Sequence, residues 1–215
     1  MRLVQLFEDW GGEQTVLNQV GTIRQNCQPY LQQNGGAIDH DALYRGVKPP
    51  GGHSVTGDGD ADVIRKEVRL TDRRPSDTPR ELHNFVNQYF QTHYGAPFRT
   101  AMFASGSQGQ ANDYGTVYVI FPAGEFQFLW SPDIEDMYSL TAEYGLEHHM
   151  EPGAQKEAFE TLEDNVLRTY QTDNLVEAIG SNHEIMIRCS HYYGIHSDIM
   201  YNKELQHQIR EGLYG

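Results

Sequence analysis

The sequence predicts an α+β protein in which short strands and helices are separated by turn-forming loops. Two observations carry this prediction. Several short segments are rich in β-branched and aromatic residues and are bounded by glycine and proline, which is typical of strands. Other segments carry apolar residues at helical spacing, and one of them has clear start and stop signals. We therefore expect strands that cluster around helices.

Length and composition favour one folded domain. The chain has 215 residues, 38% of them hydrophobic and 21% charged, which is the composition of a globular protein and not of a disordered one. A chain of this length can bury most of its apolar surface, so a single domain over residues 1–215 is expected.

The clearest helix is predicted to begin at Thr78. This residue fits the N-cap, Pro79 the first helical position, and Glu81 the residue that closes a capping box. An apolar stripe follows at helical spacing, and Gly95 ends it. His93 lies on that stripe and is interpreted as a histidine at the edge of the core, not as a ligand.

The remaining elements follow from weaker patterns. Those before this helix are a short strand or helix edge at 1–10, a helix within 14–33 ended by Gly35 and Gly36, a strand at 37–47, a flexible acidic loop at 48–60 and a half-exposed strand at 63–70. Those after it are strands at 98–105, 117–121, 125–130, 184–189 and 192–195, helices at 132–144 and 156–179, and a polar helical tail. The turn at 122–124 is predicted to join its two strands as a hairpin. The loop at 48–60 is either a lid beside a site or a solvated insertion.

The charge of the chain limits its partners. The formal net charge is −14, and no basic run provides the phosphate neutralisation that nucleic-acid binding needs. The same charge should repel anionic membranes, and no stretch approaches the roughly 20 apolar residues of a membrane span. We expect no nucleic-acid or membrane partner, and a protein partner with a basic surface. Two widely spaced cysteines, Cys27 and Cys189, and the lack of a signal-like N-terminal segment favour a reducing cytoplasm.

Three separated motifs carry the functional prediction. They are Leu43-Tyr44-Arg45-Gly46, Phe103-Ala104-Ser105-Gly106-Ser107 and Glu184-Ile185-Met186-Ile187. In this order they resemble the Arg, Ser-Thr-Ser and Glu motifs of the arginine-type mono-ADP-ribosyltransferases. The resemblance covers residues 42–195 and implies two packed, mainly antiparallel sheets with flanking helices. It also implies NAD as the substrate and a protein side chain as the acceptor of ADP-ribose.

The chemistry explains why such residue types are needed. Breaking the bond between nicotinamide and ribose creates an oxocarbenium-like cation, so a catalyst must hold the diphosphate, orient the ribose and place an anion beside the developing charge. The resemblance assigns the first role to Arg45, whose guanidinium is a rigid fork of donors, beside Gly46, which lets a ligand approach the backbone closely. It assigns the second role to Ser105 and the third to Glu184.

The flanking positions give further dinucleotide-binding candidates. Ser107 matches the serine that caps the following helix, with Gln110 completing a capping box, and the helix is expected to end at Tyr114 and Gly115. Ala111 with that Tyr-Gly pair matches the Ala-x-x-Tyr-Gly spacing of the family. Tyr44 lies beside the arginine, and Phe103 and Tyr114 are candidates for stacking on nicotinamide.

Two positions depart from the family pattern. Gly106 replaces the middle threonine, although both outer hydroxyls remain. Asn182 stands two residues before Glu184, where arginine-modifying relatives carry a Glu or Gln that activates the acceptor. This departure puts the acceptor chemistry in doubt more than the cleavage of NAD.

Other interpretations remain open. Singly, each motif also fits an ordinary role: a surface arginine, a helix cap and a glutamate that opens a strand. A non-catalytic structural or virion-associated protein would tolerate Gly106 and Asn182, and an NAD glycohydrolase would use water as the acceptor. A metal hydrolase built on the acidic and histidine residues of 147–151 is disfavoured, because adjacent histidines on a helix point about 100° apart. A serine hydrolase lacks its Gly-x-Ser-x-Gly turn.

The stretch 72–138 is also similar to proteins of large phage genomes, whose transferases modify host proteins such as RNA polymerase. This looser resemblance implies a phage factor that acts in the host cytoplasm or is carried in the virion.

Overall fold

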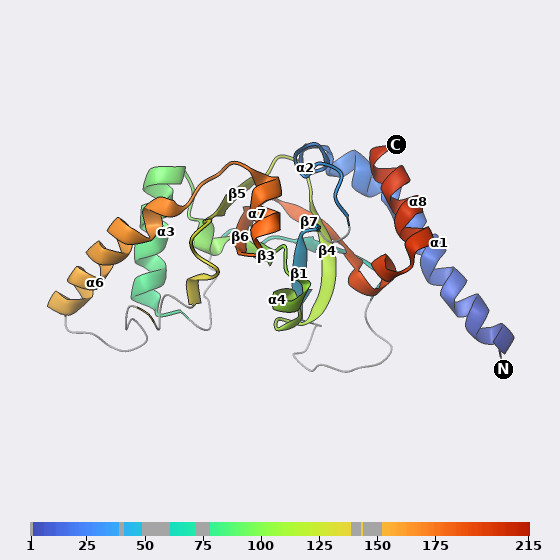
Figure 1. The fold of residues 1–215 in the computed structure, drawn as a ribbon, viewed down its shortest axis with the longest axis horizontal. Coiled ribbons are helices and arrows are strands. Elements are labelled where there is room, and N and C mark those ends of the chain that lie inside the picture. Colours follow the sequence, from blue (N-terminus) through green and yellow to red (C-terminus); the bar gives the residue numbers. More distant parts are fainter. Residues whose placement is uncertain (1, 39–40, 49–60, 72–77, 139–142, 144–151) are drawn as a thin grey trace. The chain divides into compact units, whose positions relative to one another are not determined.

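The computed structural model describes residues 2–38, 41–48, 61–71, 78–138, 143 and 152–215, and within them the α+β class is confirmed (Figure 1). The chain forms two compact units. The first unit combines Met1–Glu67, Ala104–Phe126 and Cys189–Gly215, and the second combines Val68–Phe103 and Gln127–Arg188. Each unit is described by itself below.

The strands of the first unit are antiparallel. They are β1 (Tyr44–Val47), β2 (Val63–Glu67), β4 (Thr116–Pro122), β7 (His191–His196) and the end of β3 (Met102–Ser105). Strand β4 pairs with β1 on one side and with β7 on the other, and β7 pairs with β2. Strand β4, between β1 and β7, is buried along almost its whole length. Its continuous apolar run is typical of a strand that is covered on both faces.

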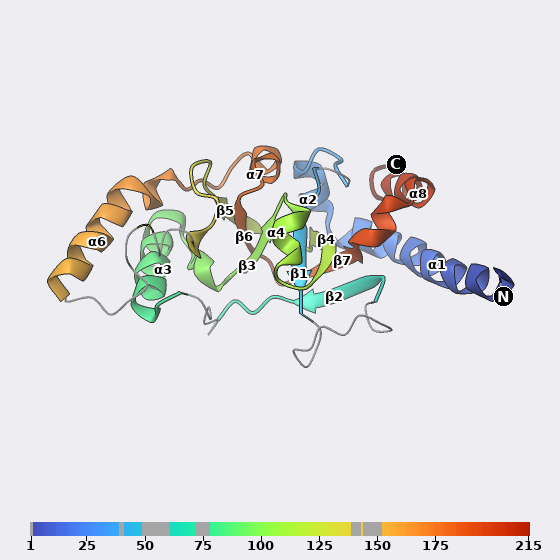
Figure 2. The ribbon, with the colours of Figure 1, turned by 60° about the horizontal axis from the view of Figure 1, so that its bottom comes forward.

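The helices of the first unit come from three separate parts of the sequence. They are α1 (Arg2–Asn26), α2 (Gln28–Gln33), α4 (Gln108–Asn112) and α8 (Lys203–Tyr214), with a 3-10 turn at Ser197–Tyr201. Helix α8 buries Leu205, Ile209 and Leu213 on one stripe and lies alongside α1, as both views show (Figures 1 and 2). The contact is close, because a Cβ at Gly212 would lie 2.5 Å from Cγ1 of Val20. The segment 2–10, for which a short strand or a helix edge was expected, is helical and belongs to α1.

The second unit packs three helices around strands β5 and β6. The elements are α3 (Arg80–Tyr94), a 3-10 turn at Phe98–Thr100, β5 (Gln127–Trp130), α6 (Pro152–Asn165), a 3-10 turn at Leu167–Thr169, α7 (Leu175–Ser181) and β6 (Glu184–Arg188), with the start of β3. Its core includes Leu82, Val86 and Phe90 of α3, at the predicted spacing, together with Leu162 of α6. Helices α3 and α6 lie side by side in both views (Figures 1 and 2).

The start of α3 differs from the prediction. Pro79 is the N-cap and not the first helical residue, and no side chain caps the helix. The hydroxyl of Thr78 instead accepts a hydrogen bond from Nη2 of Arg99 at 3.2 Å, so the predicted capping box is wrong. The predicted stop is confirmed, because Gly95 is left-handed with φ 77°. His93 is exposed, and its ring stacks on Tyr89 at 4.0 Å.

The predicted hairpin over 117–130 is wrong. Strand β4 pairs with β1 and β7, whereas β5 pairs with β6. The turn is held by other segments: the amide of Ala123 donates to the carbonyl of His191 at 3.0 Å, and that of Gly124 donates to Asn26 at 2.7 Å. These partners are distant in sequence, so the local turn pattern could not reveal them.

The predicted helix at 156–179 is divided. Helix α6 ends at Asn165, and Gln171 then forms an isolated antiparallel bridge with Trp130 at the end of β5. Asn174, left-handed with φ 58°, precedes the separate helix α7. The two backbone hydrogen bonds to Trp130 account for the interruption, because a bridged residue cannot continue a helix.

Other predicted bounds are adjusted. The strand expected at 37–47 is limited to β1, the one at 63–70 to β2, and the one at 98–105 opens with a 3-10 turn before β3. The segment 132–136 is not helical, and 139–142 and 144 lie outside the described residues, as does 49–60 of the predicted flexible loop. Hydrogen-bonded strands follow one another in the order β2-β7-β4-β1-β3-β6-β5, so two packed sheets are not confirmed.

Candidate functional site

The arginine motif lies on β1 in the first unit. Tyr44 is the register partner of Ser105 on β3, so the arginine and serine motifs occupy neighbouring strands. Arg45 is half-buried, and its guanidinium carbon lies 5.9 Å from the centre of the Tyr192 ring, within the range of a cation-π contact. Strand pairing therefore brings together two of the three predicted motifs.

Gly46 is explained by a contact inside the protein. A Cβ built on it would lie 2.0 Å from the carbonyl oxygen of Ala111 and 2.9 Å from Cβ of Tyr114. Gly115 is similarly close to β1, because its Cβ would lie 2.6 Å from the carbonyl oxygen of Val47, and its φ is 132°. Both glycines let the α4 segment approach β1 closely, so Gly46 has a packing role that needs no ligand.

The serine motif forms a hydrogen-bonded turn. The hydroxyl of Ser105 accepts from the amide of Ser107 at 3.0 Å and donates to Oε1 of Gln110 at 2.8 Å. Ser107 caps α4, with its Oγ accepting from the amide of Gln110 at 3.2 Å, as predicted. Ser105 is buried, so its orientation is fixed by the turn, whereas the side chain of Tyr114 is 57% exposed.

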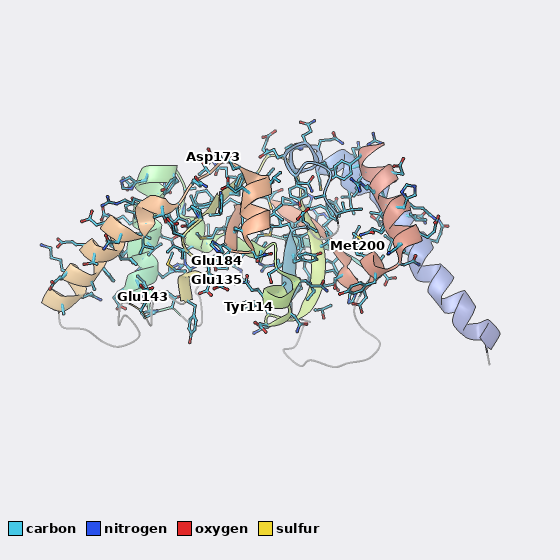
Figure 3. All side chains as sticks on the ribbon, viewed as in Figure 1. Tyr114, Glu135, Glu143, Asp173, Glu184 and Met200 are labelled. Atoms are coloured by element: carbon cyan, nitrogen blue, oxygen red, sulfur yellow. The ribbon has the colours of Figure 1, made fainter. Side chains whose placement is uncertain are left out.

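Glu184 opens strand β6 in the second unit. Its amide donates to the carbonyl of Glu135 at 2.7 Å, and the two residues are labelled in Figure 3. The Glu184 side chain is 20% exposed, and its Oε1 lies 3.3 Å from Nη1 of Arg99, whose side chain is 5% exposed. The predicted catalytic carboxylate is therefore mostly buried beside a cation.

Arg99 was not predicted from the sequence. It lies in the short 3-10 turn before β3, and its guanidinium carbon is 4.8 Å from the centre of the Phe103 ring. Phe103, a predicted stacking residue, therefore contacts this cation within the second unit. No local periodicity or motif marks position 99, because its importance depends on a carboxylate far along the chain.

Tyr170 is a buried residue that interacts electrostatically with Glu184 and Arg99. Burial, with a smaller contribution from the negative charge of Glu184, raises the pKa of the Tyr170 phenol well above its usual range. Its backbone carbonyl accepts a hydrogen bond from the hydroxyl of Tyr94 at 2.7 Å. The phenol therefore stays uncharged at neutral pH and adds no negative charge beside Glu184.

Asn182, two residues before the glutamate, has an unusual backbone. It ends α7 in the left-handed conformation, with φ 63°, and its side chain is exposed. Asparagine tolerates this conformation better than most residues, including Glu or Gln. The backbone conformation thus gives a local physical reason for an asparagine at this position.

Comparison of the chain with known protein families, curated proteins and solved structures finds no match. Tyr44, Arg45, Gly46, Ser105, Ser107 and Tyr114 belong to the first unit, and Phe103 and Glu184 belong to the second.

Two further findings concern the described residues alone. No helix among them combines the length and apolar character needed to cross a membrane. No group of three or more His, Cys, Asp or Glu residues in the described ranges is placed to hold a metal ion, and the candidate cluster at 147–151 lies outside those ranges.

Proposed function

We propose that this protein is an NAD-dependent mono-ADP-ribosyltransferase with a fold of the ADP-ribosyltransferase type. The observation that carries the proposal is the position of the Glu184 carboxylate: it opens an apolar strand, is mostly buried and lies 3.3 Å from the buried guanidinium of Arg99. A fixed, largely dehydrated carboxylate is suited to stabilising a cation. The ordered turn of Ser105 and its pairing with the arginine motif add support.

The proposed reaction breaks the bond between nicotinamide and C1′ of its ribose. Nicotinamide leaves as a neutral molecule with the electron pair of that bond, and a nucleophilic protein side chain bonds to C1′ and releases a proton. Arg45 holds the diphosphate, Ser105 orients the ribose, and Glu184 stabilises the cation and accepts the ribose 2′-hydroxyl hydrogen bond. Tyr44, Phe103, Ser107 and Tyr114 complete the proposed dinucleotide contacts, and Gly46 contributes by letting α4 pack closely on β1.

An NAD glycohydrolase is a second candidate, and Asn182 favours it. The residue at this position has no carboxylate to activate a side-chain acceptor, and its left-handed backbone disfavours a simple return to glutamate. Water would then attack C1′ and free ADP-ribose would be the product. Both candidates share the cleavage step at Glu184.

The proposed acceptor is a protein with a basic surface, because the chain carries a net charge of −14. If the protein is encoded by a phage, host cytoplasmic proteins are the proposed targets, and delivery with the virion is the alternative route.

The test is incubation of the purified full chain with NAD labelled on the adenylate, with and without bacterial lysate. The Glu184→Gln variant should lower cleavage by about a hundredfold or more, because it removes the anion. Its melting temperature should fall by several degrees, because glutamine keeps the shape of the side chain but leaves the buried guanidinium of Arg99 without its charged partner, so a native circular-dichroism spectrum at the assay temperature is the check that the variant is folded. Glu177→Gln, an exposed change on α7, is the matched control and should keep full activity.

Each outcome separates the candidates. A labelled protein band that requires Glu184 supports the transferase, and free ADP-ribose without a labelled band supports the glycohydrolase. No NAD consumption and no NAD binding would contradict both and favour the alternative of a non-catalytic structural or virion-associated protein.

A further inference from the structure

Arg99 carries a buried positive charge that has no part in the roles proposed for Arg45, Ser105 and Glu184. Its side chain is 5% exposed, and burial of a charge is costly unless the charge is paired and hydrogen-bonded. Of its guanidinium nitrogens, Nη1 contacts Oε1 of Glu184 at 3.3 Å and Nη2 donates to the hydroxyl of Thr78 at 3.2 Å. In the described part of the chain, Nε is buried and has no hydrogen-bond partner.

The geometry is not that of an ion pair optimised for stability. Charge-assisted bonds between arginine and carboxylate are usually about 2.7–2.9 Å long and often bidentate. Here a single contact of 3.3 Å joins the two groups, and among the described residues one buried donor of the arginine, Nε, has no hydrogen-bond partner. A stabilising role alone gives no reason to keep an incompletely paired guanidinium in the interior.

The arginine is held by contacts other than its carboxylate. The backbone amide of Arg99 donates to Oδ1 of Asn87 on α3 at 2.8 Å. Nη2 donates to the hydroxyl of Thr78, and the guanidinium carbon lies over the Phe103 ring, 4.8 Å from its centre. The glutamate, in contrast, is the more exposed partner. The cation is therefore held by contacts that do not depend on the carboxylate.

We propose that Arg99 is a positioning residue for Glu184, supported by Thr78 and Phe103. It fixes one carboxylate oxygen, and thereby the direction in which Glu184 faces the developing cation. This inference rests on the proposed function, since a positioning role needs a reaction to act on.

The test measures kcat and KM for NAD cleavage by the full chain and by Arg99→Met, Arg99→Lys and Thr78→Val. Methionine keeps much of the length and removes the charge, and we expect kcat to fall by about a hundredfold while KM changes by less than about threefold. Lysine restores the charge but cannot bridge Thr78 and Glu184 together, so it should recover about tenfold of the loss. Thr78→Val should lower kcat by about threefold to tenfold by loosening the guanidinium.

A double-variant cycle separates positioning from structural support. If Arg99 acts through Glu184, the Arg99→Met/Glu184→Gln protein should be no slower than Glu184→Gln alone. Independent, multiplicative losses, or a loss that falls on KM alone, would overturn the inference while leaving the proposed function intact. A wild-type chain without NAD cleavage would overturn both. If Arg99→Met fails to fold, the cycle run with Thr78→Val and Arg99→Lys gives the same decision.

Discussion

The close approach of α4 to β1 makes Gly46→Ala the sharpest structural test. A Cβ at this position would lie 2.0 Å from the carbonyl oxygen of Ala111, and it would also lie 2.9 Å from Cβ of Tyr114. Ordinary contact begins at about 3.4 Å, so α4 would have to move by roughly 1.4 Å, or β1 would have to yield. The contacted oxygen belongs to the backbone, so no side-chain rotation can relieve the overlap.

Overpacking of a well-packed interior costs about 1–3 kcal/mol, and a backbone overlap of this size should reach the upper end. For a chain of this length, about 3 kcal/mol corresponds to a fall in melting temperature of roughly 6–12 °C. The displaced α4 would also disturb the turn in which Ser105 and Ser107 are bonded. NAD binding should weaken together with stability.

The assay is chemical denaturation and thermal melting of the full chain, with Gly109→Ala as the control. Gly109 lies within α4, and its Cβ would meet only Oγ of Ser107 at 3.6 Å, an ordinary contact. Alanine there should leave stability unchanged or raise it by up to about 1 kcal/mol. A Gly46→Ala protein within about 0.5 kcal/mol of wild type would refute the packing described for this contact.

The remaining predictions concern the helix cap and the buried thiols. Ser107→Ala should cost about 1 kcal/mol of unfolding free energy and weaken NAD binding, whereas Ser190→Ala, at an exposed position, should change neither, as measured by denaturation and titration with NAD. Burial raises the pKa of both Cys27 and Cys189 to about 12, from 9.0. The native thiols should therefore react with a thiol-specific reagent at pH 8 far more slowly than the urea-unfolded chain, and equal rates would contradict their burial. As pH rises, the thiols of the unfolded chain lose their protons before the buried thiols of the folded chain do. The contribution of the two buried thiols to stability is therefore full below pH 9 and declines as pH rises towards 12. The Cys27→Ala/Cys189→Ala protein should lack this decline.

The sequence predicts what local patterns determine. The apolar stripe of α3, its stop at Gly95 and the cap at Ser107 are set by residues within one or two turns, and the structure confirms them. The strand that opens with Glu184 is likewise marked by its own apolar run.

Features that depend on distant partners could not be predicted in this way. Thr78 matched a capping pattern, yet its hydroxyl binds Arg99 because a buried guanidinium competes for it. The turn after β4 matched a hairpin pattern, yet its amides bind Asn26 and His191. Arg99 itself has no local signature, since only the fold brings it to Glu184.

The way the chain is divided between its two units also has a consequence for how it is made. The first unit cannot close until β7 is available, because β7 separates β2 from β4 in its sheet. During synthesis, β7 is translated after both β2 and β4, so the edges of these two strands stay exposed until it is made. Formation of this sheet should be slow and late, since its contacts join residues far apart along the chain. A shortened version that ends before His191 would lose the strand that joins β2 to β4, so dissection of this protein into its units requires rearranged rather than truncated genes.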